Sequence, residues 1–351
     1  MNSLKTLHSV VSAALKALTA IIASFGLLVG VSNGSTHDFF QDKTIRIIVS
    51  FSPGGGFDVY SRAIARHLGR YIPGNPNVIV ENMPGAGGLI AANRLYRSIK
   101  PDGLTFANFP GGLLMEQILG RPGIEFDARK FEYVGIPVKD IWVCILAKAR
   151  GITSIEKWLK SKTPVKLGST GPGSSTYITP RVLQVALGLA IQIVSGYKGV
   201  PDIRLATEGG ELDGGCTSWE GTKVIWGKAM QAGNAAVVVQ MTSRPHPELQ
   251  KVPLAISFAK SDDARLLIRA ATHDTAALNR AYVLPPGTLK ERVKVLRQAF
   301  MNTLKDPQFL VEVRKSKMEV DPMFGEEMED AVTRLFNLET AVVARLREVL
   351  Q

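Results

Sequence analysis

Cysteine is nearly absent from this sequence. Its 351 residues include two, Cys144 and Cys216, and neither belongs to a C-x-x-C pair. A zinc ribbon, a dithiol redox motif and a multi-disulfide framework need more cysteines or closer spacing, so all three are excluded. The pattern favours two free thiols packed as small hydrophobic residues, and a single disulfide between them is the alternative.

Motifs of the common catalytic sites are also missing. The dinucleotide fingerprint would need a third glycine where Val59 follows Gly54 and Gly56, and no G-x-x-x-x-G-K-[ST] phosphate loop is present. Ser174 and Ser218 lack the flanking glycines of a nucleophile elbow. The five histidines form no H-E-x-x-H zinc motif. The sequence therefore favours binding over catalysis, without a cofactor or a metal.

Acidic residues are fewer than basic ones. The sequence has 31 acidic and 42 basic residues, which gives a formal net charge of +11. The basic residues are scattered and are not interleaved with aromatic residues, which argues against nucleic acid as a partner. With 45% hydrophobic and 21% charged residues, the composition is that of a folded globular protein. A chain of this length is expected to form about two domains.

Residues 1–34 have the pattern of a secretory signal peptide. Lys5 and Lys16 precede an apolar run over residues 17–31, which is short for a membrane span of about 20 residues. Cleavage near Gly34 removes these two lysines, so the formal charge falls from +11 to +9. Export is expected, and a retained signal anchor or a buried helix is the alternative.

The rest of the chain alternates between strand-like runs and segments with helical periodicity. Strands are expected near residues 45–51, 78–80, 165–169, 191–195, 214–218 and 235–241. Helices are expected at residues 58–68 and 89–99, in the segment that ends near 187, and from 288 onward with breaks near 306–307 and 323–325. This alternation indicates βαβ units and mainly parallel sheets, and hence an α/β fold.

Glycine is concentrated in three loops that follow expected strands and precede expected helices, at residues 52–56, 82–88 and 170–175. Open α/β sheets bind ligands at the carboxyl ends of their strands. Glycine lets the backbone approach a ligand closely, and free N–H groups at a helix start favour an anion. The loops therefore predict a site for a carboxylate or another small polar anion.

Two titratable residues near the first loop have structural explanations. Asp58 is expected to be the N-cap of the helix that follows the loop, and a role as general base is the alternative. His67 falls on the apolar face of the same helix, where a packed core histidine is expected rather than a catalytic one.

Several loops, taken in order, resemble those of one known family. The segments that carry the resemblance are residues 51–58 (FSPGGGFD) with Arg62, 80–88 (VENMPGAGG), 101–105 (PDGLT), 168–174 (GSTGPGS), 196–199 (GYKG), 210–213 (GELD) and 284–288 (LPPGT). In this order they are similar to the Bug family of extracytoplasmic solute receptors, which serve tripartite tricarboxylate transporters. The resemblance runs from about residue 44 to the C-terminus.

The resemblance implies a two-lobed Venus-flytrap receptor with the type II periplasmic-binding-protein fold, each lobe a mainly parallel sheet flanked by helices. Lobe 1 would comprise residues 44–137 and 241–351, and lobe 2 residues 138–240. A small organic acid would lie in the cleft between the lobes and pass to separate membrane permease subunits. Such receptors are periplasmic, commonly monomeric and not enzymes. A sensory receptor for a signalling partner, or a cleft enzyme that uses Asp58 or Ser174, is the alternative.

The resemblance also assigns ligand-binding residues by position. They lie in or directly beside the three glycine loops and at residue 197, and are Phe51, Ser52, Gly55, Gly56, Phe57, Asp58, Ala86, Gly87, Ser169, Thr170, Gly171, Ser174, Ser175 and Tyr197. Phe57 stands where the family often has a small hydroxyl residue, which favours a more apolar or aromatic ligand. Trp219 is expected to pack inside the fold, and stacking on a ligand is the alternative.

Overall fold

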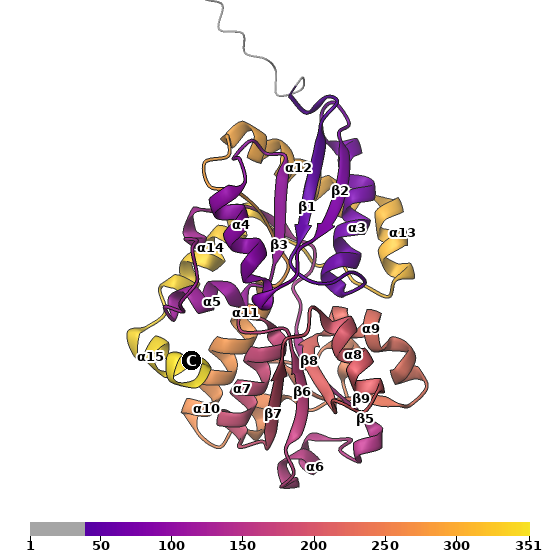
Figure 1. Ribbon diagram of the computed structural model, residues 1–351, viewed down its shortest axis with the longest axis vertical. Coiled ribbons are helices and arrows are strands. Elements are labelled where there is room, and N and C mark those ends of the chain that lie inside the picture. The colour runs from indigo at the N-terminus through magenta and orange to yellow at the C-terminus, as the bar shows by residue number, and fades with distance from the viewer. Residues whose placement is uncertain (1–38) are drawn as a thin grey trace, which may run out of the picture.

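The computed structural model describes residues 39–351, which form two β-sheets with helices around them (Figure 1). The signal peptide expected at residues 1–34 lies outside the described residues. Within residues 39–351, none of the helices combines the length and the apolar character that crossing a membrane requires.

The first sheet has six strands in the order β11-β4-β10-β3-β1-β2. Their bounds are β1 (Thr44–Val49), β2 (Asn77–Asn82), β3 (Thr105–Phe109), β4 (Glu132–Ile136), β10 (Ala281–Leu284) and β11 (Met323–Phe324). The first three strands pair in parallel, with β1 in the middle. The loops that follow β1 and β2 therefore leave the same edge of the sheet.

The second sheet has five strands in the order β7-β6-β8-β5-β9. Their bounds are β5 (Trp142–Ala147), β6 (Val165–Ser169), β7 (Ile191–Ser195), β8 (Gly214–Ser218) and β9 (Ala235–Met241). β6 pairs in parallel with both β7 and β8, so the loops after these three strands also share one edge. Figure 1 shows the first sheet above the second, with the chain passing between them.

The α/β fold is confirmed, but the sheets are mixed rather than mainly parallel. In the first sheet β10 runs antiparallel to both β3 and β4, and β11 runs antiparallel to β4. In the second sheet β5 runs antiparallel to β8 and β9. Sequence periodicity does not reveal strand direction, because a buried strand carries the same apolar run in either orientation.

Thirteen α-helices lie in the described part of the chain, and many of them stand between two strands in the element order. They are α3 (Gly56–Leu68), α4 (Leu89–Ser98), α5 (Gly112–Ile118), α6 (Ile155–Lys160), α7 (Ser175–Leu187), α8 (Val200–Glu208), α9 (Trp219–Gln231), α10 (Asp262–Ile268), α11 (Asp274–Ala277), α12 (Lys290–Lys305), α13 (Pro307–Lys315), α14 (Gly325–Phe336) and α15 (Thr340–Leu350). The expected breaks near residues 306 and 323 separate α12 from α13 and α13 from α14.

Helix α3 shows how apolar spacing places a helix on its sheet. Its buried face includes Tyr60, Ala63, Ile64 and Leu68, which recur at the three- and four-residue spacing of one helical stripe. This stripe packs on β1 and β2, and α12 and α13 cover it from the side. The packing fixes the start of α3, and with it the first glycine loop, at the edge that faces the second sheet.

The C-terminal part of the chain contacts both sheets. Helices α12 and α14 pack on β4 of the first sheet, whereas α10 and α15 pack on α7, which covers the second sheet (Figure 1). We keep as a proposal the division into two lobes, residues 44–137 with 241–351 and residues 138–240. The strands divide between the two sheets at about these bounds. Helices α10 and α15 are exceptions, because they belong to the first range and pack on α7 beside the second sheet.

The two cysteines form a disulfide, Cys144–Cys216, so the expectation of free thiols was wrong. The two residues lie directly opposite each other on the antiparallel strands β5 and β8, and both are fully buried. A separation of 72 residues hides this pairing in the sequence, because strand register, and not spacing, brings the two side chains together.

Candidate functional site

Four helices begin around one cavity between the two sheets. Gly56, Ser175 and Val200 are the first residues of α3, α7 and α8, and Ser218 is the N-cap of α9. The complete lining is Phe51, Ser52, Gly55, Gly56, Phe57, Thr170, Ser175, Thr176, Val200, Pro201, Thr217, Ser218, Gly221 and Arg280. The first N–H groups of a helix have no partner within the helix and carry a partial positive charge. The cavity is therefore suited to an anion.

The cavity is small because the two halves of the molecule touch around it. Its volume is about 30 Å³, which is room for roughly one water molecule. Ser52 donates its N–H to the Lys198 carbonyl at 3.1 Å and its hydroxyl to Asp202 Oδ2 at 2.9 Å. Gly87 N–H bonds the Thr170 carbonyl at 2.9 Å. These bonds join the loops of one sheet to those of the other, so an organic ligand needs the halves to separate.

Asp58 supports the first loop from behind and does not line the cavity. The expectation that it is the N-cap was wrong, because α3 begins at Gly56 and Gly55 is the N-cap. Its buried carboxylate instead accepts the Gly54 N–H at 2.9 Å and pairs with Arg62 at 2.9 Å. Burial alone would raise the pKa of Asp58, but these bonds and one from Asn82 hold it below its ordinary value. The carboxylate stays charged and rigidifies the loop.

Neutral hydroxyl groups hold the second-sheet glycine loop. Thr176 Oγ1 accepts the Thr170 N–H at 2.9 Å, and Ser169 Oγ accepts the Gly171 N–H at 3.0 Å. Ser174 donates to the Gly171 carbonyl at 2.6 Å and lies 2.7 Å from Thr176 Oγ1. The hydroxyls of Ser169 and Ser174 are thus engaged by the loop itself, and neither residue lines the cavity.

The loop after β2 touches the second-sheet loop backbone to backbone. Gly87 has a φ of +67°, and a Cβ there would lie 2.2 Å from the Pro172 carbonyl oxygen, so a larger residue would push the loops apart. Ala86 also has a positive φ of 49°. Both residues lie beside the cavity and outside its lining. Their contact controls how closely the halves approach.

Half of the expected ligand-binding residues line the cavity. Seven do so: Phe51, Ser52, Gly55, Gly56, Phe57, Thr170 and Ser175. The remaining seven do not: Asp58, Ala86, Gly87, Ser169, Gly171, Ser174 and Tyr197. Tyr197 donates its hydroxyl to Glu211 Oε1 at 2.6 Å, and burial together with this bond raises its pKa to about 12. These fourteen positions remain a prediction as ligand contacts.

Arg280 was not among the ligand-binding residues expected from the sequence, yet it lines the cavity and is fully buried. It lies directly before β10 and pairs with Asp140, while its Nη2 donates to Ser218 Oγ at 2.6 Å. Burial alone would lower the pKa of Arg280, but Asp140, Tyr60 and Glu220 together outweigh this effect and raise it. A lone arginine between the apolar runs 276–278 and 281–284 is the one sequence signal that marks it.

A buried ionic cluster stands behind Arg280. Glu220 of α9 accepts the Tyr60 hydroxyl of α3 at 3.1 Å and the Glu319 N–H at 2.7 Å, and it pairs with Lys223 at 2.7 Å. Burial and the charge of Asp140 raise the pKa of Glu220. The cluster ties α9, beside the second sheet, to α3, beside the first.

Trp219 and His67 both have structural roles. The Trp219 indole donates to Glu248 Oε2 at 2.7 Å and packs with Val143 and Leu249, away from the cavity lining. His67 is buried beside Phe309, with its Nε2 2.9 Å from Glu312 Oε2. This geometry agrees with the expectation that both side chains pack inside the fold.

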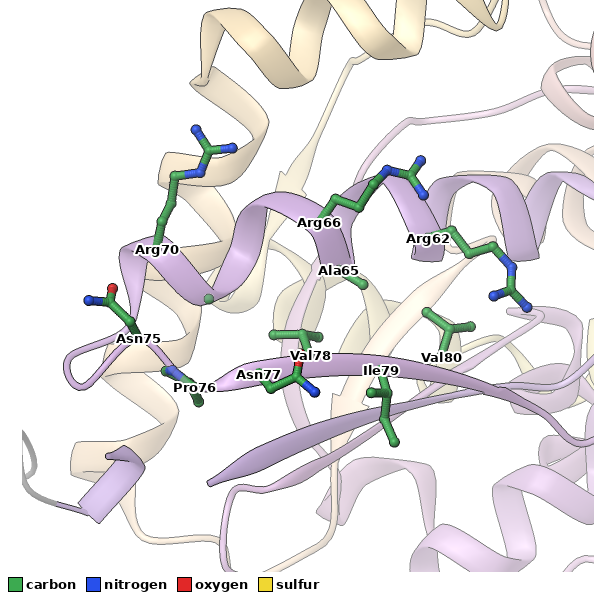
Figure 2. A pocket seen from close by; sticks show the side chains of 11 residues that line it. Arg62, Ala65, Arg66, Arg70, Asn75, Pro76, Asn77, Val78, Ile79 and Val80 are labelled. Atoms are coloured by element: carbon green, nitrogen blue, oxygen red, sulfur yellow. The ribbon is translucent and has the colours of Figure 1, made fainter. Parts of the chain in front are cut away.

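A larger hollow of about 820 Å³ lies on the outside of the first sheet, between α3 and the edge strand β2 (Figure 2). Arg62 and Arg66 of α3, and Arg70 of the short 3-10 helix Gly69–Tyr71 that follows it, line this groove. Each is already paired: Arg62 with Asp58, Arg66 with Glu312, and Arg70 with Asp306. This groove is open and its charges are balanced, so the cavity between the sheets is the better candidate site.

Sequence relatives of the chain come from two groups of bacterial proteins, although no family model matches it. It is 23% identical over 356 residues to a UPF0065 protein from the gbd 5′ region of Cupriavidus necator, covering 97% of both chains. It is 38% identical over 88 residues to protein BugT of Bordetella pertussis, covering 25% of this chain and 26% of that protein.

Solved structures share the fold of the described residues. The periplasmic binding protein BugD has a TM-score of 0.69 at 20% identity, with 88% of this chain and 97% of that chain covered. MatC from Rhodopseudomonas palustris, with bound malate, has a TM-score of 0.67 at 20% identity, with 88% and 99% covered. An R. palustris protein solved with adipate has a TM-score of 0.70 at 20% identity, with 88% and 98% covered. The chain is thus similar in sequence to UPF0065 and Bug proteins, and its described residues share the fold of periplasmic binding proteins.

Proposed function

We propose that this chain is a periplasmic receptor that binds a small organic carboxylate between two lobes and delivers it to a membrane transporter of the tripartite tricarboxylate type. The lobes are residues 44–137 with 241–351, and residues 138–240. The signal peptide at residues 1–34 directs export, separate chains form the permease, and the receptor acts as a monomer. Binding is reversible and changes no covalent bond.

The observation that carries this proposal is the convergence of helix starts on one cavity between the sheets. Gly56 and Ser175 begin helices that belong to different sheets, yet both line the cavity. A carboxylate held there accepts hydrogen bonds from both halves at once. Such a ligand binds the closed arrangement better than the open one, and this difference in affinity shifts the population toward closure.

The related structures support the same ligand class. MatC was solved with malate and a second R. palustris protein with adipate, and both are small carboxylates. The disulfide Cys144–Cys216 supports export, because such bonds persist in oxidising compartments like the periplasm.

No specific observation favours the enzyme alternative. Asp58 is engaged by Gly54 and Arg62, and Ser174 by Gly171 and Thr176. Neither residue lines the cavity in the closed arrangement seen here. Nothing in the fold favours a signalling partner over a permease.

Thermal unfolding of the purified protein against a panel of organic acids tests the proposal. The protein is first unfolded and refolded to remove any bound ligand. An acid at about 100 times its dissociation constant stabilises the protein by roughly 2.7 kcal/mol and raises the melting temperature by a few degrees. Failure of every acid to raise it would overturn the carboxylate assignment.

A matched pair of variants assigns the shift to the cavity. Ser175→Phe fills the cavity wall and is expected to abolish the shift, since Ser175 lines the cavity. Ser243→Phe adds the same ring at an exposed serine and leaves the shift unchanged. An equal shift in both variants would place the ligand elsewhere.

A further inference from the structure

Arg280 is the one residue with a full charge among those that line the cavity between the sheets, in the described part of the chain. Its side chain is fully buried, so solvent does not satisfy its N–H groups. Its backbone has a φ of +62°, a left-handed conformation that non-glycine residues rarely adopt. Strain of this kind persists where the surrounding structure enforces it, and it often marks a functional position.

The hydrogen-bonding groups of Arg280 are only partly used. Nη1 pairs with Asp140 and Nη2 donates to Ser218 Oγ, whereas Nε–H is buried and has no partner. A guanidinium offers five N–H donors and binds carboxylates well. Since burying an N–H without an acceptor costs free energy, an acceptor supplied by a ligand stabilises the site.

The helix starts around the cavity single out one further position for negative charge. Three of the four helices already carry an acidic residue in the first turn, Asp58 in α3, Asp202 in α8 and Glu220 in α9. Helix α7 has none, so its partial charge of roughly +0.5 is not offset. The anion position therefore lies between Arg280 and the start of α7, where Ser175 lines the cavity.

The same cavity has room for little more than one negative charge. The positive charge of Arg280 is already balanced by Asp140, so Nε–H and the start of α7 together offset about one carboxylate. Nearby carboxylates have their own partners: Glu220 pairs with Lys223, and Asp58 with Arg62. A second carboxylate on the ligand would be buried without compensation, which is costly.

Aromatic and aliphatic groups form one part of the cavity wall, and uncharged serine and threonine residues form another. The guanidinium of Arg280 lies 5.2 Å from the ring centres of both Phe57 and Tyr60. Phe51 packs edge-on against Phe57 at 4.8 Å, and Pro201 completes this side of the lining. These groups complement an apolar ligand body and offer no second charge.

Building on the proposed receptor function, we infer that Arg280 is a ligand-binding residue and that the receptor selects monocarboxylates with an apolar or aromatic body. The carboxylate accepts a hydrogen bond from Arg280 Nε–H and from the amides that begin α7. The body lies against Phe51 and Phe57, and dicarboxylates bind more weakly.

Isothermal titration calorimetry with matched ligands tests this selectivity on the refolded protein. Hexanoate and adipate share a six-carbon chain and differ by one carboxylate, and hexanamide removes the charge altogether; benzoate and benzamide form a second pair. Hexanoate or benzoate is expected to bind at least tenfold more tightly than its amide, and hexanoate at least tenfold more tightly than adipate. Binding of malate or adipate without binding of either monocarboxylate would overturn this inference and leave the receptor proposal standing. Absence of binding by every acid would overturn both.

Variants then assign the selectivity to Arg280. Replacing Arg280 alone would leave the buried Asp140 carboxylate without its charged partner. The test therefore uses the double variant Arg280→Gln with Asp140→Asn, checked for cooperative unfolding. Its affinity for the better monocarboxylate is expected to fall at least tenfold, and the preference for acid over amide to vanish. Lys228→Gln removes an exposed cation from α9 and serves as the control for net charge, with unchanged affinity expected.

A folded double variant that keeps the acid-over-amide preference would overturn the role of Arg280. If the double variant does not fold, Asp140→Asn with Arg280→Lys, which keeps the charge and moves the donor, must also weaken the preference.

Discussion

The two lobes present similar glycine loops to the cavity, yet they stabilise them differently. Each loop follows a parallel strand and leads into a helix of 13 residues, α3 in the first lobe and α7 in the second. The first loop is held by the charged carboxylate of Asp58, which bonds Gly54 and Arg62. The second is held by the neutral hydroxyl of Thr176, which bonds Thr170 and Ser174.

The two sheets also differ in covalent cross-linking. The second sheet is cross-linked by Cys144–Cys216, and the described part of the first sheet contains no cysteine. The geometry of such a glycine loop therefore does not require one kind of support. A charge, a hydroxyl or a covalent bond nearby can hold it, and each responds to a different change in conditions.

The largest expected effect comes from loss of the disulfide. The bond spans 72 residues, so the loop-closure model gives about 4 kcal/mol of stabilisation. The double variant Cys144→Ala with Cys216→Ala is expected to lose about this much free energy of unfolding, measured by urea denaturation. A reducing agent should lower the stability of the wild-type protein and leave the double variant unchanged. Equal sensitivity of both proteins to the reductant would contradict the prediction.

Removal of the Asp58 carboxylate is the next largest. Asp58→Ala leaves Gly54 N–H without its acceptor and removes one of the two acceptors of Asn82 Nδ2, while Arg62 can turn to solvent, so a loss of about 2–3 kcal/mol is expected. Chemical denaturation measures it. Glu291→Ala removes an exposed carboxylate from the first turn of α12 and should cost less than about 1 kcal/mol. Similar losses in the two variants would show that Asp58 has no special role.

Thr176→Val should have a smaller effect, since a neutral hydrogen bond contributes less than a charged one. Loss of the acceptor for the Thr170 N–H is expected to cost about 1–2 kcal/mol. Thr179→Val provides the matched control on the same helix, because its buried hydroxyl has no partner, and it should be nearly neutral. The prediction is wrong if Thr179→Val destabilises the protein as much as Thr176→Val does.

The smallest expected effect is a difference in how the stabilisation of the two loops responds to acid. The folded state lowers the pKa of Asp58, so its contribution is fully present above the unfolded value of about 4 and is lost as pH falls through the folded value. The difference in unfolding free energy between wild type and Asp58→Asn should therefore shrink below about pH 4. The difference between wild type and Thr176→Val should stay constant over the same range. Parallel behaviour of the two differences would remove the distinction between the loops.

Much of the fold could be predicted from local sequence. The strands expected at 165–169, 191–195, 214–218 and 235–241 match β6 to β9, because apolar runs between turn residues mark buried strands well. The N-cap of α3 was expected at Asp58, three residues after the observed N-cap Gly55, since α3 begins inside the glycine loop where no side chain marks its start.

The site itself was harder to predict. The glycine loops were correctly placed at the strand ends, but the direction of their hydroxyl groups depends on contacts within each loop. Ser174 therefore bonds Gly171 instead of facing the cavity, whereas its neighbour Ser175 lines it. Adjacent residues at a helix start point in different directions, and sequence similarity does not distinguish them.

The sequence by itself determined the α/β alternation, the three glycine loops and the helices that follow them, because these depend on periodicity and on residues close together in the chain. Tertiary structure alone decided three other features. The register of β5 and β8 paired the cysteines, the path before β10 placed Arg280 in the cavity, and the approach of the two sheets closed Gly87 against Pro172. Each of these joins residues far apart in sequence, and the packing of the whole chain is what brings them together.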